Sequence, residues 1–205
     1  MAQTDRLKFS AMRLLGNGLF EIGAYADALS AERAELSILM RFGGQEVDIL
    51  AVQSNLACTY EAIGRGDEAM RLRKAIYSGH LKLHGKVHEL TLVAANNYAV
   101  SLRDLLRFEE AKSLLRKTMP VTRRVLGEGH RLTLKMKKIY ADSLYKDPTA
   151  TLNDLREAVT TLEDMERIAR RVLGGAHPMT EETERELQES RAALRARETS
   201  SSGTG

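Results

Sequence analysis

Two asparagines, Asn55 and Asn97, lie 42 residues apart in matching sequence surroundings. An asparagine side chain carries both a donor and an acceptor, so it can bind an extended peptide backbone through two hydrogen bonds, whatever the side chains of that peptide. Each asparagine stands two residues before an alanine, Ala57 or Ala99, that is expected to face a partner helix. Because two residues turn a helical side chain by about 200°, we expect both amides to point away from that contact.

Basic side chains accompany these asparagines. Arg13 and Asn17 are four residues apart, which places them on one face of the first predicted helix, where Arg13 would attract an acidic peptide. Arg103, Lys135 and Lys138 either extend a basic inner surface or are simply solvated charges. The candidate peptide-binding residues are therefore Arg13, Asn17, Asn55, Asn97, Arg103, Lys135 and Lys138.

The sequence contains no recognisable catalytic motif. The glycines of 127–129 lie in a connector between helices, and residues 88–92 lack the second histidine of a zinc protease. His80 and His84 have a spacing that could share a metal ion, but two surface histidines near a helix C-terminus are the favoured interpretation. Cys58 is interpreted as a small buried or groove-lining residue rather than a reactive thiol. We predict no enzyme activity, no cofactor and no metal.

Composition narrows the class of protein. The chain has 205 residues, of which 43% are hydrophobic and 29% charged, enough for a sizeable core. Its formal net charge of +3 is too small to indicate a specific nucleic-acid partner or membrane binding. A single cysteine excludes an internal disulfide framework, and the N-terminus lacks the apolar run of a signal peptide or membrane span. We expect a cytoplasmic protein, and the composition does not predict an oligomeric state.

The candidate residues belong to a repeating pattern. Six residues recur at an offset of 42, and the matched positions are Asn55/Asn97, Ala57/Ala99, Ala69/Ala111, Gly85/Gly127, His88/His130 and Thr91/Thr133. The offset widens to 47 at Gly174, His177 and Thr180, which places about five extra residues near 147–151. A period of 20 to 50 residues predicts a solenoid, in which each unit buries its apolar face against its neighbours.

Apolar spacing and glycine positions divide each repeat into two helices. We predict a solenoid over residues 1–198, with four antiparallel helix pairs at about 5–43, 46–85, 88–127 and 130–174, a capping helix at 178–197 and a disordered tail at 199–205. The Gly-x-x-His-x-x-Thr segments are predicted connectors, with histidine or threonine at the start of the next helix. Pro120 lies inside a helical pattern, where we expect a bend rather than a stop.

The sequence resembles tetratricopeptide repeats, specifically the 42-residue type found in kinesin light chains. The resemblance rests on 97–99 (Asn-Tyr-Ala), 108–111 (Phe-Glu-Glu-Ala) and 125–130 (Val-Leu-Gly-Glu-Gly-His), and it covers about residues 10–180. It implies an all-α, right-handed solenoid whose concave surface is lined by the first helix of each pair. Peptide-binding members carry asparagines in the register of Asn55 and Asn97, so the resemblance implies a peptide groove there.

The resemblance extends in part to a clamp for a C-terminal carboxylate. Arg13, Asn17 and Asn55 look like part of the clamp that chaperone-binding members use. The third repeat has Val93 and Asn97 where that clamp has two basic residues, so we do not expect a complete clamp.

Two functions fit these features. The leading hypothesis is a non-enzymatic adaptor that binds a peptide segment of a partner protein across its inner helices. The alternative is a structural subunit that docks into a larger assembly through its outer helices or its ends and has no free peptide site. An open groove beside the asparagines favours the first function, whereas a groove filled by the C-terminal helix favours the second.

Overall fold

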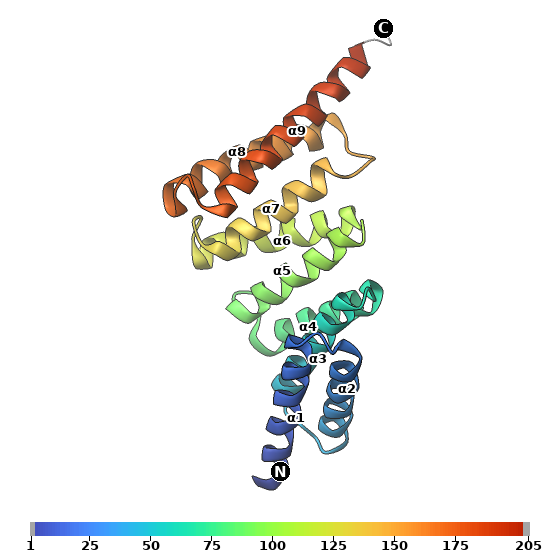
Figure 1. Cartoon of the computed structure of the whole chain (residues 1–205). Helices are drawn as coiled ribbons and strands as arrows, with labels where there is room; N and C mark the ends of the chain where they lie inside the picture. Colours follow the sequence, from blue (N-terminus) through green and yellow to red (C-terminus); the bar gives the residue numbers. More distant parts are fainter. Residues whose placement is uncertain (1–2, 203–205) are drawn as a thin grey trace. The chain divides into compact units, whose positions relative to one another are not determined.

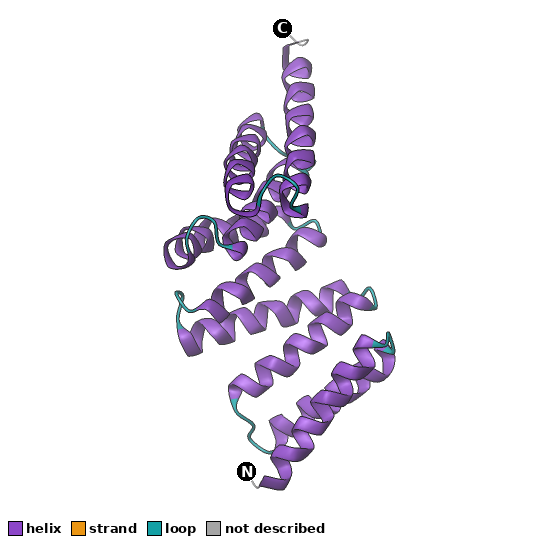
Figure 2. Cartoon of the chain, turned by 60° about the vertical axis from the view of Figure 1, so that its left-hand side comes forward, coloured by secondary structure: helices purple, strands orange, loops and turns teal. Residues whose placement is uncertain are grey.

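The computed structural model describes the backbone of residues 3–202 and the side chains of residues 10–199. All regular secondary structure in this part of the chain is helical, as Figure 1 and Figure 2 show. The nine helices of the described residues are α1 (Gln3–Glu21), α2 (Tyr25–Arg41), α3 (Glu46–Ala62), α4 (Gly66–His84), α5 (Glu89–Asp104), α6 (Phe108–Leu126), α7 (Arg131–Tyr145), α8 (Leu152–Leu173) and α9 (Pro178–Ser202). Four pairs followed by one further helix confirm the predicted all-α solenoid class.

The helices group into two compact units, Met1–Gly85 and Lys86–Gly205. The first unit holds α1 to α4, and the second holds α5 to α9. The sequence predicts one solenoid over 1–198, but the chain divides at the connector after the second pair. Each unit is therefore described by itself, and the right-handed superhelix stays a prediction. Among the described helices, none combines the length and apolar character needed to cross a bilayer.

Small residues lie where the two helices of a pair meet. Ala57 and Ala69 in the first unit, like Ala99 and Ala111 in the second, have no exposed surface. In the first pair this position is Gly16, where an added Cβ atom would lie only 3.2 Å from the Cγ atom of Glu32. Backbones therefore approach closely at these crossings, as the repeat pattern predicts.

The predicted connectors between pairs have the same geometry at each complete copy. Gly127 and Gly174 have positive φ angles of 96° and 91°. After each comes a histidine at the N-cap position, and the Nδ1 atom of His130 accepts a hydrogen bond from the backbone N–H of Leu132 at 3.2 Å. The Thr133 hydroxyl then donates to the Gly127 carbonyl at 2.8 Å. These bonds satisfy backbone groups that a helix end otherwise leaves unpaired.

The turns inside the pairs differ in one residue. Gly23 and Gly64 take positive φ angles of 79° and 75°, and the third pair places Leu106 in the same conformation with φ 58°. The Arg107 N–H donates to the Leu102 carbonyl at 2.8 Å, just as the Arg65 N–H donates to the Tyr60 carbonyl. A left-handed conformation costs a residue with a Cβ atom roughly 1–2 kcal/mol, so Leu106 closes this turn at a cost that glycine avoids.

Three segments depart from the regular repeat. α6 continues through Pro120 without a stop, as predicted, whereas the bend expected there stays a prediction. The extra segment between α7 and α8 is fixed by Asp147, whose Oδ1 atom accepts hydrogen bonds from the backbone N–H and the hydroxyl of Thr149 at 2.8 and 2.7 Å. α8 then begins with a capping box between Thr151 and Asp154.

The last helix, α9, begins like an inner helix and ends beyond its predicted boundary. Leu187 is buried against Ala141 and Leu162, so α9 covers the fourth pair. Counting the repeat offsets of 42, 42 and 47 from Ala57 leads to Ala99, Ala141 and Gln188. The three alanines are buried, whereas Gln188 is exposed. Residues 199–202 are helical, which corrects the predicted disorder there. Extending an established helix by a few residues costs far less than starting one. Residues 203–205 lie outside the described part of the chain.

We expect Ala111→Leu to lower the free energy of unfolding by roughly 1–3 kcal/mol, because the added side chain overpacks a fully buried crossing. Urea unfolding followed by circular dichroism measures this change. Ala192→Leu, at an exposed position of α9, is the control and should alter stability by less than about 0.5 kcal/mol. Equal stability of Ala111→Leu and the wild type would show that the crossing is not tightly packed.

Candidate functional site

The first unit brings two predicted residues together. The Asn55 side chain on α3 donates a hydrogen bond from Nδ2 to the Oδ1 atom of Asn17 on α1, at 2.9 Å. These amides line a cleft of about 280 Å³, here called the asparagine cleft, whose residues are Asn17, Phe20, Glu21, Glu32, Asn55 and Cys58. The cleft thus contains amide, carboxylate, aromatic and thiol groups contributed by three helices, α1, α2 and α3.

Arg13 is engaged within the protein. Its Nε atom lies 3.2 Å from Oε1 of the buried Glu35, and one of its terminal nitrogens lies 3.4 Å from Oδ1 of Asp48. Burial raises the pKa of Glu35, an effect that the charge of Arg13 partly offsets. Arg13 therefore links α1 to α2 and α3, and its guanidinium is already paired with two carboxylates of this chain.

The cysteine and the two histidines that the sequence analysis considered in the first unit contact other side chains. A terminal nitrogen of Arg73 lies 3.2 Å from the Sγ atom of Cys58, which is half-buried at the asparagine cleft, as the groove-lining interpretation predicts. The rings of His80 and His84 stack with centroids 5.6 Å apart. Among the described residues, no group of three or more His, Cys, Asp or Glu side chains is arranged to hold a metal ion.

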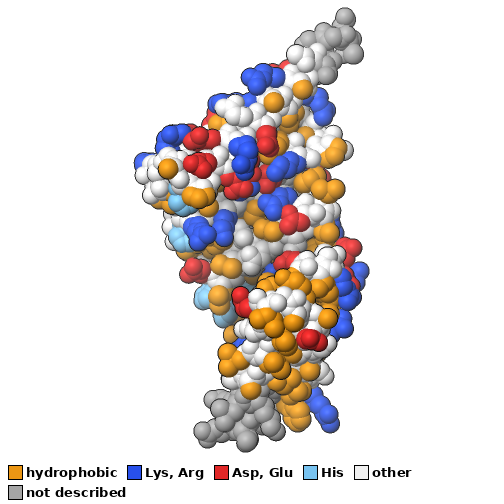
Figure 3. Space-filling model, viewed as in Figure 1, with side chains coloured by type: hydrophobic (Ala, Val, Ile, Leu, Met, Phe, Trp, Pro, Cys, Tyr) orange, Lys and Arg blue, Asp and Glu red, His pale blue; other side chains and the backbone are white. Residues whose placement is uncertain are grey.

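The second unit contains a larger cleft between its inner helices, called here the inner cleft. α5 contacts α7, and α7 contacts α9. The cleft has a volume of about 600 Å³ and is lined by Arg103, Asp104, Leu106, Phe108, Lys138, Asp142, Lys146, Glu182, Arg185, Glu186 and Glu189. Figure 3 shows charges of both signs interspersed on the visible face of this unit.

A buried carboxylate organises the inner cleft. Asp142 is 2% exposed, and its Oδ2 atom lies 3.1 Å from the Arg103 guanidinium and 3.6 Å from the Lys138 ammonium. Its Oδ1 atom lies 2.7 Å from the ammonium of Lys146. Three cations from α5, α7 and the residue after α7 therefore converge on one negative charge. Such convergence offsets part of the cost of removing the carboxylate from water.

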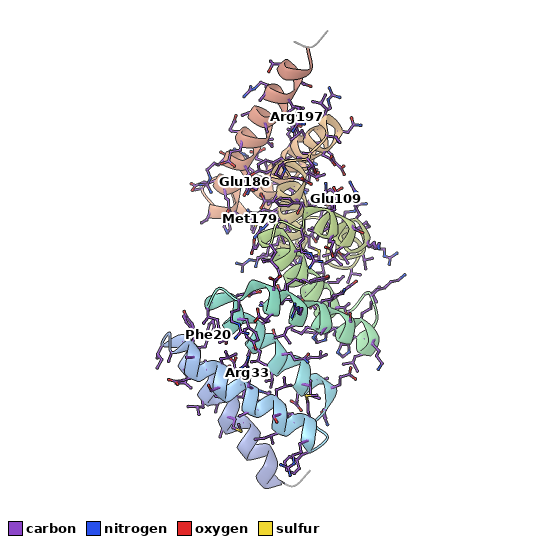
Figure 4. The ribbon with its side chains drawn as sticks, turned by 90° about the vertical axis from the view of Figure 1, so that its right-hand side faces the viewer. Phe20, Arg33, Glu109, Met179, Glu186 and Arg197 are labelled. Atoms are coloured by element: carbon purple, nitrogen blue, oxygen red, sulfur yellow. The ribbon has the colours of Figure 1, made fainter. Side chains whose placement is uncertain are left out.

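Glu186 extends this network to α9, where Figure 4 shows it on the same helix as Met179. Its Oε1 atom lies 2.5 Å from the Lys138 ammonium, and its Oε2 atom is buried without a hydrogen-bond partner among the described residues. Burial raises the pKa of Glu186, and the hydrogen bond from Lys138 opposes this shift without cancelling it. Burial lowers the pKa of Lys138, but the hydrogen bond to Glu186 and the charge of Asp142 more than compensate, so the net shift is upward.

The predicted basic residues therefore differ in availability. Arg103 and Lys138 are paired with carboxylates, whereas Lys135 is exposed on α7. Asn97 is half-buried on α5, and its Oδ1 atom accepts a hydrogen bond from the Nδ2 atom of Asn96 at 3.2 Å. Asn55 and Asn97 lie in different units, so each amide is placed only within its own unit.

Sequence reasoning missed the acidic half of the inner cleft. Asp142 could have been found, because its spacing of four from Lys138 places both on one face of α7. Glu186 could also have been found, because it is the repeat equivalent of the two candidate asparagines. The offsets of 42, 42 and 47 lead from Asn55 through Asn97 and Ile139 to Glu186. The Glu186 to Lys138 contact depends on how α9 packs, which the helical pattern alone does not specify.

Comparisons with known proteins agree with this fold. Residues 91–132 match the family model for the tetratricopeptide repeat. A kinesin-light-chain-type protein of Podosopora anserina with nearly identical TPR-like repeats has a similar structure, with a TM-score of 0.77 at 22% identity over 98% of this chain and 93% of that one. A variant of that protein gives a TM-score of 0.79 at 22% identity, covering 98% of this chain and 92% of the variant. No curated protein sequence matches the chain.

A third solved structure is also similar. BtubC (BKLC) of P. vanneervenii has a TM-score of 0.69 at 16% identity, covering 98% of this chain and 85% of that one. The chain thus contains a tetratricopeptide repeat in its third helix pair and has the fold of kinesin-light-chain-like repeat proteins.

We expect the stability of the wild type relative to Glu186→Gln to increase as the pH falls from about 7 to about 5. Because burial raises its pKa, Glu186 binds a proton more tightly in the folded chain than in the unfolded chain. Its contribution to stability is therefore greatest at low pH and is lost as the pH rises through the folded-state pKa. Urea unfolding of both proteins at each pH measures the difference. Glu181→Gln, at an exposed position of α9, controls for the loss of a carboxylate from this helix. A difference that is flat or grows with pH contradicts the prediction.

Proposed function

We propose that this protein is a non-enzymatic adaptor that binds a peptide segment of a partner protein along the inner helices of its repeats. The observation that carries the proposal is the accessibility of an asparagine on an inner helix of each unit. Asn55 lines the asparagine cleft, and Asn97 is half-buried on α5. An amide in such a position can both donate to and accept from a peptide backbone.

The accessible face of α5 supports this proposal. Val93, Asn97, Val100 and Asp104 follow one another at spacings of four, three and four, so they form one stripe along the helix. Val93 is 36% exposed, and Asp104 lies at the edge of the inner cleft. An apolar side chain, an amide and a carboxylate in line offer mixed contacts of the kind that an extended or loosely helical segment can use.

The position of α9 bears on the alternative. α9 supplies one wall of the inner cleft, with Glu182, Arg185, Glu186 and Glu189, and leaves a volume of about 600 Å³ unfilled. A cleft of this size falls within the range of sites that bind small groups or single side chains. This space favours a peptide site over a groove closed by the chain's own last helix.

A specific feature of the first unit favours the docked-subunit function as a second candidate. Leu14, Leu15, Ile22, Met40 and Phe42 are all more than half exposed. Figure 3 shows hydrophobic side chains gathered on the visible face of this unit. Exposed apolar patches on soluble domains often mark interaction sites. Docking through this unit leaves the inner-helix amides unused, so amide variants separate the two functions.

We expect Asn55→Ala and Asn97→Ala each to weaken partner binding by about 0.5–1.5 kcal/mol, the net value of one neutral hydrogen bond. The folding stability of Asn55→Ala should change little, because the hydrogen bond from Asn55 to Asn17 is exposed. Asn97→Ala also removes the acceptor of the buried Asn96 amide, so its free energy of unfolding is measured alongside its binding. A pull-down with the intact chain identifies a partner, and calorimetry with that partner then measures both single variants and the double variant.

Asn153→Ala is the matched control, since Asn153 is exposed on α8, the second helix of its pair. It should bind the partner like the wild type. If the double asparagine variant folds and binds with unchanged affinity, the peptide-binding proposal fails. Loss of binding in Phe42→Ser alone would instead support docking through the first unit.

A further inference from the structure

Leu106 combines an unfavourable backbone conformation with an exposed apolar side chain. It is the one non-glycine residue with positive φ among those that the structure describes, and its side chain is 73% exposed. The equivalent turns use Gly23 and Gly64. Burial cannot explain the leucine, because little of its surface is covered. Residues held in sparsely populated conformations cluster at functional sites, so this outlier is a reason to look for a function.

Leu106 lies between two clefts of the second unit. One is the inner cleft, and the other, called here the turn cleft, has a volume of about 570 Å³. The turn cleft is lined by Leu106, Arg107, Phe108, Glu109, Glu110, Lys146, Asp147, Pro148 and Thr149. Leu106, Phe108 and Lys146 line both clefts, so a ligand seated over Leu106 can reach into each of them.

The extra segment between α7 and α8 forms one wall of the turn cleft. Asp147, Pro148 and Thr149 belong to the residues that widen the repeat offset from 42 to 47. The hydrogen bonds of Asp147 with Thr149 fix this wall, and the Lys112 ammonium lies 3.4 Å from the Asp147 Oδ2 atom. The wall and Leu106 are therefore two departures from the regular repeat that meet at one place.

The charges around Leu106 indicate the chemistry of a ligand. The inner cleft has five carboxylates and four basic groups, and the turn cleft adds three carboxylates and one further basic group, Arg107. The lining residues thus have an excess of three formal negative charges. Lys112, which pairs with Glu109 and Asp147 from behind, reduces this excess to two, in a chain whose net charge is +3. Arg103, Lys138, Lys146 and Arg107 are ion-paired with carboxylates of these clefts. Because the carboxylates outnumber the basic groups, the net charge around Leu106 favours an added cation over an added anion.

We propose that Leu106 and the two clefts beside it bind a segment of a partner protein in which an apolar side chain is flanked by lysine or arginine. The apolar side chain packs on the exposed Leu106, above the buried Phe108, and the flanking cations face the carboxylates of the two clefts. This inference rests on the proposed adaptor function and names the chemistry of the segment that it takes.

Synthetic peptides of defined composition test the proposal with the full chain. The first fluorescein-labelled peptide carries a leucine between lysines in a Gly/Ser background, the second replaces the lysines with glutamates, and the third replaces the leucine with serine. Fluorescence polarisation should show the first peptide binding at least about tenfold more tightly than either of the others, because both the apolar contact and the charges contribute. Added salt should weaken this binding.

Two variants separate binding from folding. Leu106→Gly restores the residue found in the other turns, and Leu106→Asn keeps a side chain that tolerates positive φ. Both should retain or raise the melting temperature and should weaken the first peptide about tenfold or more. Ile22→Asn is the matched control, because Ile22 is 78% exposed beside Gly23 in the first unit. It should leave peptide binding unchanged.

Several results would overturn the proposal. These are unchanged binding in Leu106→Gly, preference for the glutamate peptide, an equal loss in Ile22→Asn, and no binding of the first peptide by the wild type. If Leu106→Gly retains peptide binding while Asn97→Ala loses it, the adaptor function stands and only the Leu106 site is refuted. If the asparagine variants bind the partner with unchanged affinity, the adaptor proposal fails. That result is separate from the peptide measurements on the Leu106 variants.

Discussion

Close contact between the helices of each pair is the constraint on which this structure depends. At Ala57, Ala69, Ala99 and Ala111 the contact leaves no exposed surface, and a larger side chain has no space there. Since the second helix of each pair is held close at these points, the first helices of consecutive pairs become neighbours, as α5 and α7 do. The inner cleft is thus a consequence of packing that occurs on the opposite side of the same helices.

The polar groups of that cleft follow from the same arrangement. Once α7 lies between α5 and α9, Lys138 and Asp142 face charged residues from both neighbours. A buried ion pair compensates for the loss of water only when further partners are present, and Asp142 has three cations around it. These ion pairs explain why Lys138 of the lysine-rich helix α7 does not contribute to a free basic surface.

Periodic features were predictable from the sequence, and individual departures were not. The offset of 42 predicted the helix pairs, the buried alanines and the connectors, because those positions obey one physical requirement in every copy. Leu106 breaks the glycine pattern, and no propensity assigns a leucine to the left-handed conformation. The ion pairs of Glu186 and the division into two units depend on contacts between distant segments, which a local pattern does not encode.

Gln188 has a consequence for the assembly of this fold. In the regular pairs the corresponding position is alanine, and a second helix lies directly against it. A helix that stacked on α9 in the same way would have to bury a primary amide and exclude its hydrating water, with no matching partner in the repeat.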